Sequence, residues 1–68
     1  MDKYIKEAMR TFYSEPEGWT TDEIYEEYRN VCRLHGVEIR PKSVVIREIC
    51  GEYNCTLEER VVKIFRRR

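Results

Sequence analysis

Apolar residues recur at intervals of three and four in three separate stretches of the chain, the spacing that places side chains on one face of a helix. In the first stretch they are Tyr4, Ile5, Ala8, Met9, Phe12 and Tyr13. Asp2 precedes them, where a carboxylate can cap a helix and favour its positive end. Pro16 and Gly18 then break the pattern. We therefore predict a helix over residues 3–13 and a turn over 14–18.

The second stretch begins at a capping box, since Thr20 and Glu23 have the spacing in which each side chain bonds the other residue's amide. Gly36 is a natural residue for the C-terminal cap, so this helix should end near His35. Its predicted buried stripe is Ile24, Tyr25, Tyr28, Val31, Cys32 and His35. Its predicted outward residues are Glu23, Glu26, Glu27 and Arg33.

The third stretch follows Pro41, a residue suited to the first position of a helix because its φ is already fixed. We predict a helix over about residues 41–51 that buries Ile46, Ile49, Cys50 and Tyr53, flanked by Val45. The opposite side then carries Ser43, Val44, Arg47, Glu48 and Gly51. This second set is expected to face a partner.

Two short β-branched runs, residues 55–57 and 61–65, close the chain on either side of Glu58, Glu59 and Arg60. They predict an antiparallel hairpin. A late helix over 57–66 competes with it, because Thr56 could cap such a helix and its apolar residues also fit a helical stripe. We favour the hairpin, so the predicted class is mostly α with a small β hairpin (α+β).

A chain of 68 residues fits one domain, here predicted to span residues 1–68. No apolar run approaches the roughly 20 residues needed to cross a bilayer, and the N-terminus lacks the apolar core of a secretory signal. We expect a cytoplasmic protein without a membrane or small-molecule partner. No activated nucleophile, acid–base pair or glycine-rich phosphate loop is recognisable, so we predict neither an enzyme nor a cofactor.

Charge is abundant but unevenly distributed along the chain. The bias toward Glu and Arg, with two Asn and no Gln, is typical of proteins from hot environments. The formal net charge is zero, yet residues 1–30 hold eight acidic and four basic side chains, and residues 31–68 hold five acidic and nine basic ones. This distribution predicts that one half of the molecule could face phosphates.

Three helices, a capping threonine before the second and a terminal hairpin together resemble the winged helix-turn-helix superfamily. The segment TTDEIYEEYRNVCRLHGVEIRP, residues 20–41, is similar to part of the C-terminal winged-helix domain of archaeal origin-recognition initiators. The chain lacks the ATPase module of those initiators, and its half-acidic wing loop is shorter than is usual in the family. In size it resembles the compact transcription regulators of archaea and their viruses and plasmids.

The resemblance implies a transcription regulator that binds double-stranded DNA with its third helix in the major groove. The side chains expected at the groove are Arg40, Lys42, Ser43, Val44 and Arg47. Those expected on the backbone are Arg60, Lys63, Arg66 and Arg67 from the hairpin. The DNA hypothesis depends on a cationic side of the third helix that the rest of the molecule leaves uncovered. If Arg40, Lys42 and Arg47 were packed against neighbouring segments or neutralised by carboxylates, the case for a nucleic-acid ligand would be removed.

Two further partners follow from the same reading. A small regulator often acts as a homodimer, and Tyr4 and Phe12 of the first helix are a candidate dimer surface, although both fit a core stripe equally well. The rival function is a protein-interaction module that docks its acidic face, with Glu23, Glu26 and Glu27, on a basic partner.

The cysteines allow three readings. Cys32, His35, Cys50 and Cys55 could form a zinc set, but their spacing is a weak match, and we predict no metal. Buried thiols are the second reading. A disulfide from Cys50 to Cys55 or from Cys32 to Cys50 is the third, since hot-adapted intracellular proteins do form them.

Overall fold

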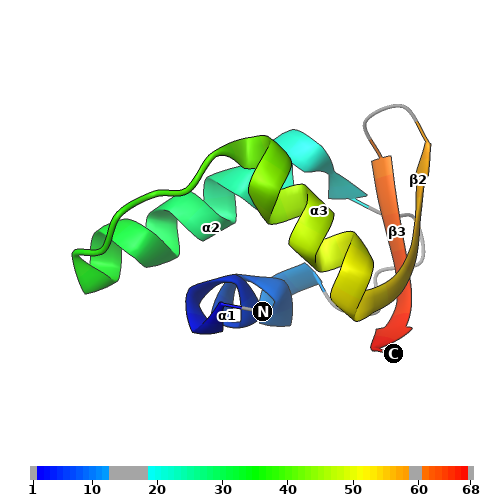
Figure 1. Ribbon diagram of the computed structural model, residues 1–68, viewed down its shortest axis with the longest axis horizontal. Coiled ribbons are helices and arrows are strands. Elements are labelled where there is room, and N and C mark those ends of the chain that lie inside the picture. The colour runs from blue at the N-terminus through cyan, green and yellow to red at the C-terminus, as the bar shows by residue number, and fades with distance from the viewer. Residues whose placement is uncertain (1, 13–18, 59–60, 68) are drawn as a thin grey trace.

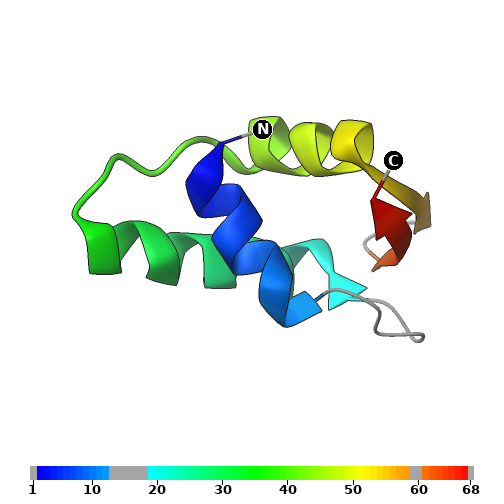
Figure 2. The same ribbon diagram turned by 90° about the horizontal axis from the view of Figure 1, so that it is seen from below.

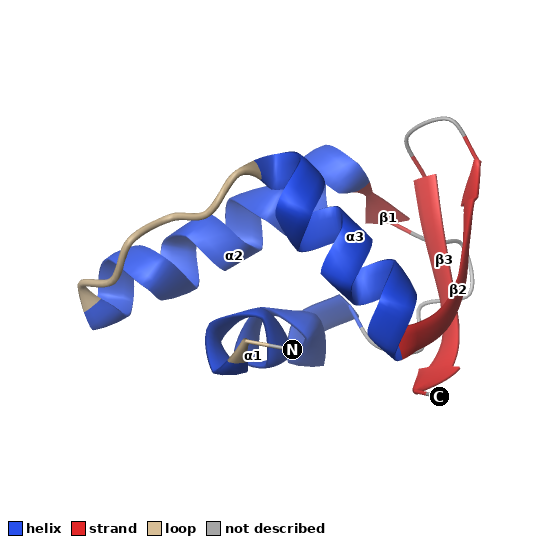
Figure 3. Cartoon of the chain, viewed as in Figure 1, coloured by secondary structure: helices blue, strands red, loops and turns tan. Residues whose placement is uncertain are grey.

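Three helices and a small sheet make up the computed structural model, which describes residues 2–12, 19–58 and 61–67 (Figure 1). Side chains are described for residues 2–10, 12 and 19–52. The elements run α1 (Lys3–Phe12), β1 (Trp19–Thr20), α2 (Thr21–His35), α3 (Lys42–Glu52), β2 (Tyr53–Glu58) and β3 (Val61–Arg67). The strands lie together at one end of the molecule (Figure 3). The fold is mostly helical, as predicted.

The predicted caps fix where the first two helices begin. Asp2 accepts a bond from the Tyr4 amide at 2.7 Å, and its carbonyl accepts the Lys6 amide. Thr20 and Glu23 form the predicted capping box, with both bonds at 3.1 Å. Each cap satisfies amides that a helix leaves unbonded at its start.

The end of α2 also agrees with the prediction. Gly36 adopts the left-handed conformation at φ 65°, and its amide donates to carbonyls of the last turn. The Val37 amide donates to the Cys32 carbonyl at 3.0 Å, which completes a Schellman-type cap. The chain is thereby turned toward α3.

The start of α3 differs from the prediction by one residue. The amides of Val44 and Val45 both donate to the Pro41 carbonyl at 3.1 Å. Pro41 therefore occupies the capping position and not the first helical position, and α3 begins at Lys42.

Strand pairing places β3 in the middle of the sheet, in the order β1-β3-β2, with both pairs antiparallel. The pairing of β2 with β3 agrees with the predicted hairpin and not with a late helix. A register shift between Asn54 and Cys55 marks a bulge in this pair. The two-residue β1 was not predicted, because it exists only through pairing of Trp19 and Thr20 with Val62 and Val61.

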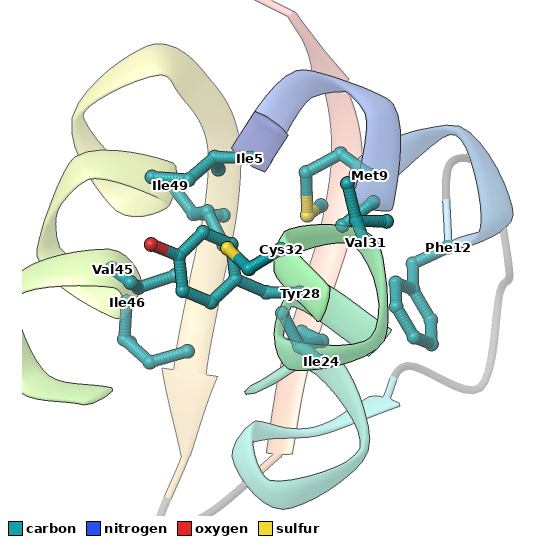
Figure 4. Packing of buried hydrophobic residues seen from close by; sticks show 11 residues of the cluster. Ile5, Met9, Phe12, Ile24, Tyr28, Val31, Cys32, Val45, Ile46 and Ile49 are labelled. Atoms are coloured by element: carbon teal, nitrogen blue, oxygen red, sulfur yellow. The ribbon is translucent and has the colours of Figure 1, made fainter. Parts of the chain in front are cut away.

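Side chains from all three helices form the core (Figure 4). Its buried members are Ile5, Ala8, Met9, Phe12, Ile24, Tyr28, Val31, Cys32, Val45, Ile46 and Ile49. Seen from below, α1 crosses from the α3 side at its N-terminal end toward α2 at its C-terminal end (Figure 2). The helical stripes predicted from the sequence, with the flanking Val45, contain all of these residues.

Three predictions about individual positions change. Phe12 lies in the core with 3% exposure, so it cannot form a dimer surface. His35 is exposed and not on the buried stripe, because it lies in the last turn of α2, beyond the cover of the core. Tyr25 is half-buried, at the edge of the core. Tyr13 lies outside the described residues.

Candidate nucleic-acid interface

Two tyrosines of α2 hold the backbone at the entrance to α3. The Tyr25 hydroxyl donates to the Arg40 carbonyl at 2.7 Å, and the Arg40 amide donates to the Tyr28 hydroxyl at 3.0 Å. Their rings stack with centroids 5.9 Å apart. Both backbone polar groups of Arg40 are thus bonded to one helix, which fixes the point from which α3 begins.

Burial is the largest of the effects that raise the pKa of Tyr28 to about 12, and contact with the Cys32 thiol acts in the same direction. The bond from the Arg40 amide opposes them. The hydroxyl therefore stays protonated at neutral pH and can accept from Arg40.

The Arg40 side chain is not the uncovered cation that the DNA hypothesis requires. Its Nη1 lies 2.7 Å from Glu48 Oε2, in ionic contact without the alignment of a hydrogen bond, and 3.4 Å from Asp2 Oδ2. The guanidinium is half-buried between the start of α1 and the second turn of α3. This expectation was wrong because both carboxylates approach only when the helices pack.

Lys42 is also paired, with its Nζ in contact with the Asp22 carboxylate in the first turn of α2. It was likewise expected to be uncovered. Asp22 is 20 residues away along the chain, so local spacing gives no indication of the contact. Two of the three cations at the predicted groove are therefore neutralised by carboxylates.

Arg47 does meet the expectation. It is exposed on the side of α3 opposite the buried Val45 and Ile49. Within the described part of the chain it has no ion-pair partner. Ser43 and Gly51 are exposed on the same helix, whereas Val44 is half-buried and offers less apolar surface than predicted. The open face of α3, defined here as Ser43, Arg47 and Gly51, contains one unpaired positive charge.

The four basic residues predicted for the hairpin are only partly located. Lys63, Arg66 and Arg67 belong to β3, and their side chains are not among those described. Arg60 lies outside the described residues. Lys63, Arg66 and Arg67 pair with Thr56, Asn54 and Tyr53 of β2, whereas β1 pairs only with Val61 and Val62 of β3.

The acidic face of α2, proposed for the rival function, is partly used within the helix. Glu23 belongs to the capping box. Glu26 pairs with Arg29, which lowers the pKa of the Glu26 carboxyl. The Arg29 guanidinium also lies 5.5 Å from the Tyr25 ring centroid. Less of this face is available to a partner than the sequence indicates.

The described cysteines are free thiols. Cys32 is buried and Cys50 is half-buried, so the disulfide between them is not formed. The side chain of Cys55 lies outside those described. Across residues 2–10, 12 and 19–52, no three His, Cys, Asp or Glu side chains gather as a metal site would require.

Sequence reasoning missed the acidic partners Asp2, Asp22 and Glu48, and it missed the cations of α1. Lys3, Lys6 and Arg10 are all exposed, at spacings that share one side of a helix. That spacing was a visible signal. It was overlooked because residues 1–30 carry a net negative charge.

No family model, curated protein or solved structure matches this chain. None of the described helices has the length and apolar character of a membrane span.

Proposed function

We propose that this protein binds double-stranded DNA as a winged helix-turn-helix regulator, with α3 in the major groove. The observation that carries the proposal is the open face of α3, where Arg47 is exposed and unpaired among the described residues while the opposite face is buried. The order of three helices and a paired strand hairpin supports it.

The dimensions of α3 suit a groove. Its 11 residues extend about 16 Å, and a helix with its side chains is about as wide as the B-DNA major groove. Tyr25 and Tyr28 hold its entrance rigidly, which supports a fixed angle of approach. Arg47 is then the side chain for a bidentate contact with guanine, and Ser43 for a hydrogen bond to a base or phosphate.

The ion pairs of Arg40 and Lys42 at the start of α3 lower the local positive charge without closing the face. An exposed pair such as Lys42–Asp22 contributes only about 0–1 kcal/mol. A phosphate can therefore replace the Asp22 carboxylate on Lys42 at small cost. Arg40, held by two carboxylates, acts as a support for α3 and not as a base-reading residue.

The test is a salt titration of duplex binding, measured by fluorescence anisotropy on a mixed-sequence duplex and then on a site selected from a random pool. Affinity should fall linearly with salt on logarithmic axes. On the selected site, Arg47→Ala should weaken binding by about 5- to 150-fold, as loss of a bidentate base contact does.

The matched control is Arg33→Ala, which removes the same charge from an exposed position on α2. It should leave the affinity nearly unchanged. No duplex binding at low salt, or an equal loss in both variants, would contradict the proposal.

A protein-interaction module is the second candidate, and one observation favours it. Leu34 is 79% exposed at the end of α2, and Ile39 is 37% exposed in the connection to α3. Exposed apolar patches mark contact surfaces, and Leu34 and Ile39 are the large apolar side chains that the described residues expose. Leu34→Asp would abolish partner binding under this second function and leave duplex binding intact under the first.

A further inference from the structure

A hollow with a volume of about 340 Å³ lies between α1 and the end of α2, away from the open face of α3. Its lining residues are Lys3, Tyr4, Lys6, Glu7, Arg10 and His35. Figure 2 shows the molecule from the side of α1, the helix that contributes most of these residues. The volume is at the lower end of the range for small-ligand sites, so the hollow suits a small group or one part of a larger ligand.

The charge of the hollow is positive, although it belongs to the acidic half of the sequence. Lys3, Lys6 and Arg10 line it, and Glu7 is the one acidic residue among the six. All three cations are exposed, and none has an ion-pair partner in the described part of the chain. The hollow therefore has a net positive charge even with His35 neutral.

Aromatic contacts fix the rest of the wall. The Tyr4 and His35 rings lie 5.2 Å apart at an angle of 47°, and Lys3 Nζ lies 5.2 Å from the Tyr4 ring centroid. His35 Nε2 is 3.2 Å from Glu7 Oε1, so the acidic residue is held at one edge by the histidine. The three cations remain available to a ligand.

We propose that this hollow binds a phosphoryl group, from either a nucleotide or a nucleic-acid backbone. Two ammonium groups and one guanidinium supply many more donors than a single carboxylate can use, whereas a phosphoryl group offers several acceptor oxygens and up to two charges. The proposal does not rest on DNA recognition by α3, because no residue is common to the two surfaces.

Chemical-shift titrations with inorganic phosphate, adenosine 5′-monophosphate and adenosine test the proposal on the full chain. Phosphate and the nucleotide should shift the amide signals of residues 3–10 and the ring signals of His35, and adenosine should not. The double variant Lys6→Gln, Arg10→Gln should raise the Kd at least about tenfold, as expected for loss of charge-assisted contacts. Glu7→Gln should lower the Kd, because it removes the one repelling charge.

Two controls lie outside the hollow: Glu38→Gln makes the same charge change as Glu7→Gln, and Arg33→Gln removes one of the two positive charges that the double variant removes. Neither should change the Kd appreciably. If phosphate and nucleotide shift no signals of α1, or if the controls act as strongly as the hollow variants, the proposal is overturned.

A short duplex distinguishes the source of the phosphoryl group. If the duplex shifts the α1 signals as much as the nucleotide does, and if the double variant abolishes these shifts, the phosphoryl group belongs to a nucleic-acid backbone. Shifts with nucleotide alone identify a small ligand. Since Arg47→Ala affects only the open face of α3, a protein that fails the phosphate titration can still pass the duplex test, and the reverse.

Discussion

Tyr28 connects the core of the molecule to its candidate interface through a single side chain. Its ring is 1% exposed and extends from α2 toward Val45 and Ile49 of α3 (Figure 4). Its hydroxyl accepts the Arg40 amide just before α3 begins. A tyrosine is required because phenylalanine would fill the same space but leave that amide without an acceptor.

The first prediction concerns Tyr28→Phe. At neutral pH the variant should lose about 1–3 kcal/mol of unfolding free energy, the usual result of leaving a partly buried donor unbonded. At alkaline pH the stability advantage of the wild type over Tyr28→Phe should become smaller. The folded-state pKa of about 12 lies above the ordinary 10.0, so the stability that neutral Tyr28 contributes is complete below pH 10 and is lost as pH rises toward 12.

Denaturant unfolding from pH 8 to pH 12 measures this. The wild type should lose on the order of 2 kcal/mol more than Tyr28→Phe over that range. Tyr25→Phe is the matched control, because it removes the other hydroxyl at Arg40 and keeps Tyr28. Equal alkaline losses in wild type and Tyr28→Phe would show that Tyr28 does not titrate in this way.

At the scale of the elements, two glycines have opposite roles. Gly36 ends α2 at φ 65°, where an L side chain is strained, and Gly51 lies within α3. A Cβ added at either position would meet nothing within 4 Å. Substitution at these sites therefore tests backbone conformation without a steric clash.

We expect Gly36→Ala to destabilise the protein by about 1 kcal/mol, through the left-handed conformation that alanine disfavours. Gly51→Ala should stabilise it by about 0.5–1 kcal/mol, because alanine loses less backbone freedom on entering a helix. Thermal unfolding of both variants gives the signs. Destabilisation by both would contradict the helical assignment at Gly51.

Local signals account for most of the elements. The capping box at Thr20, the glycine cap at Gly36 and the burial of Val45, Ile46 and Ile49 in α3 follow from spacings of a few residues, and the structure confirms them. Of the other two residues predicted for that stripe, Cys50 is half-buried, and Tyr53 belongs to β2, where its side chain is not described. The same reasoning located Arg47 on an exposed face. These features depend on neighbours within one or two helical turns, which the sequence displays directly.

Contacts between distant segments were not predictable in this way. The strand β1 needs β3, and the Arg40–Asp2 and Lys42–Asp22 pairs join residues 38 and 20 positions apart. The hollow likewise needs His35 beside α1. No periodicity indicates which of 13 acidic residues will reach a given cation; packing of the helices decides it.

Charge is therefore distributed differently over the folded molecule than along the sequence. The acidic first half and basic second half do not form two separate faces, because Asp2 and Asp22 of the first half pair with Arg40 and Lys42 of the second. The start of α3 is held against α1 and α2 by these pairs. Under the proposed function, Asp2 and Asp22 therefore limit how far Arg40 and Lys42 are available to DNA.

Replacing Asp22 by asparagine tests this at the scale of the molecule. Asp22→Asn should free Lys42 for a phosphate, so duplex affinity should rise and the slope of log affinity against log salt should steepen by about 0.9, the value for one added phosphate contact. Stability should change by no more than about 1 kcal/mol, from a weak surface pair and a lost charge at the start of α2.

Glu38→Gln is the control for net charge, because Glu38 is exposed in the connection before α3 and belongs to neither pair. It raises the net charge equally but frees no cation, so the salt slope should stay at the wild-type value. The double variant Asp22→Asn, Lys42→Gln should return to that slope as well. A steeper slope in Glu38→Gln would mean that the gain comes from overall charge. A steeper slope in the double variant, whose net charge equals that of the wild type, would mean that Lys42 does not touch the duplex.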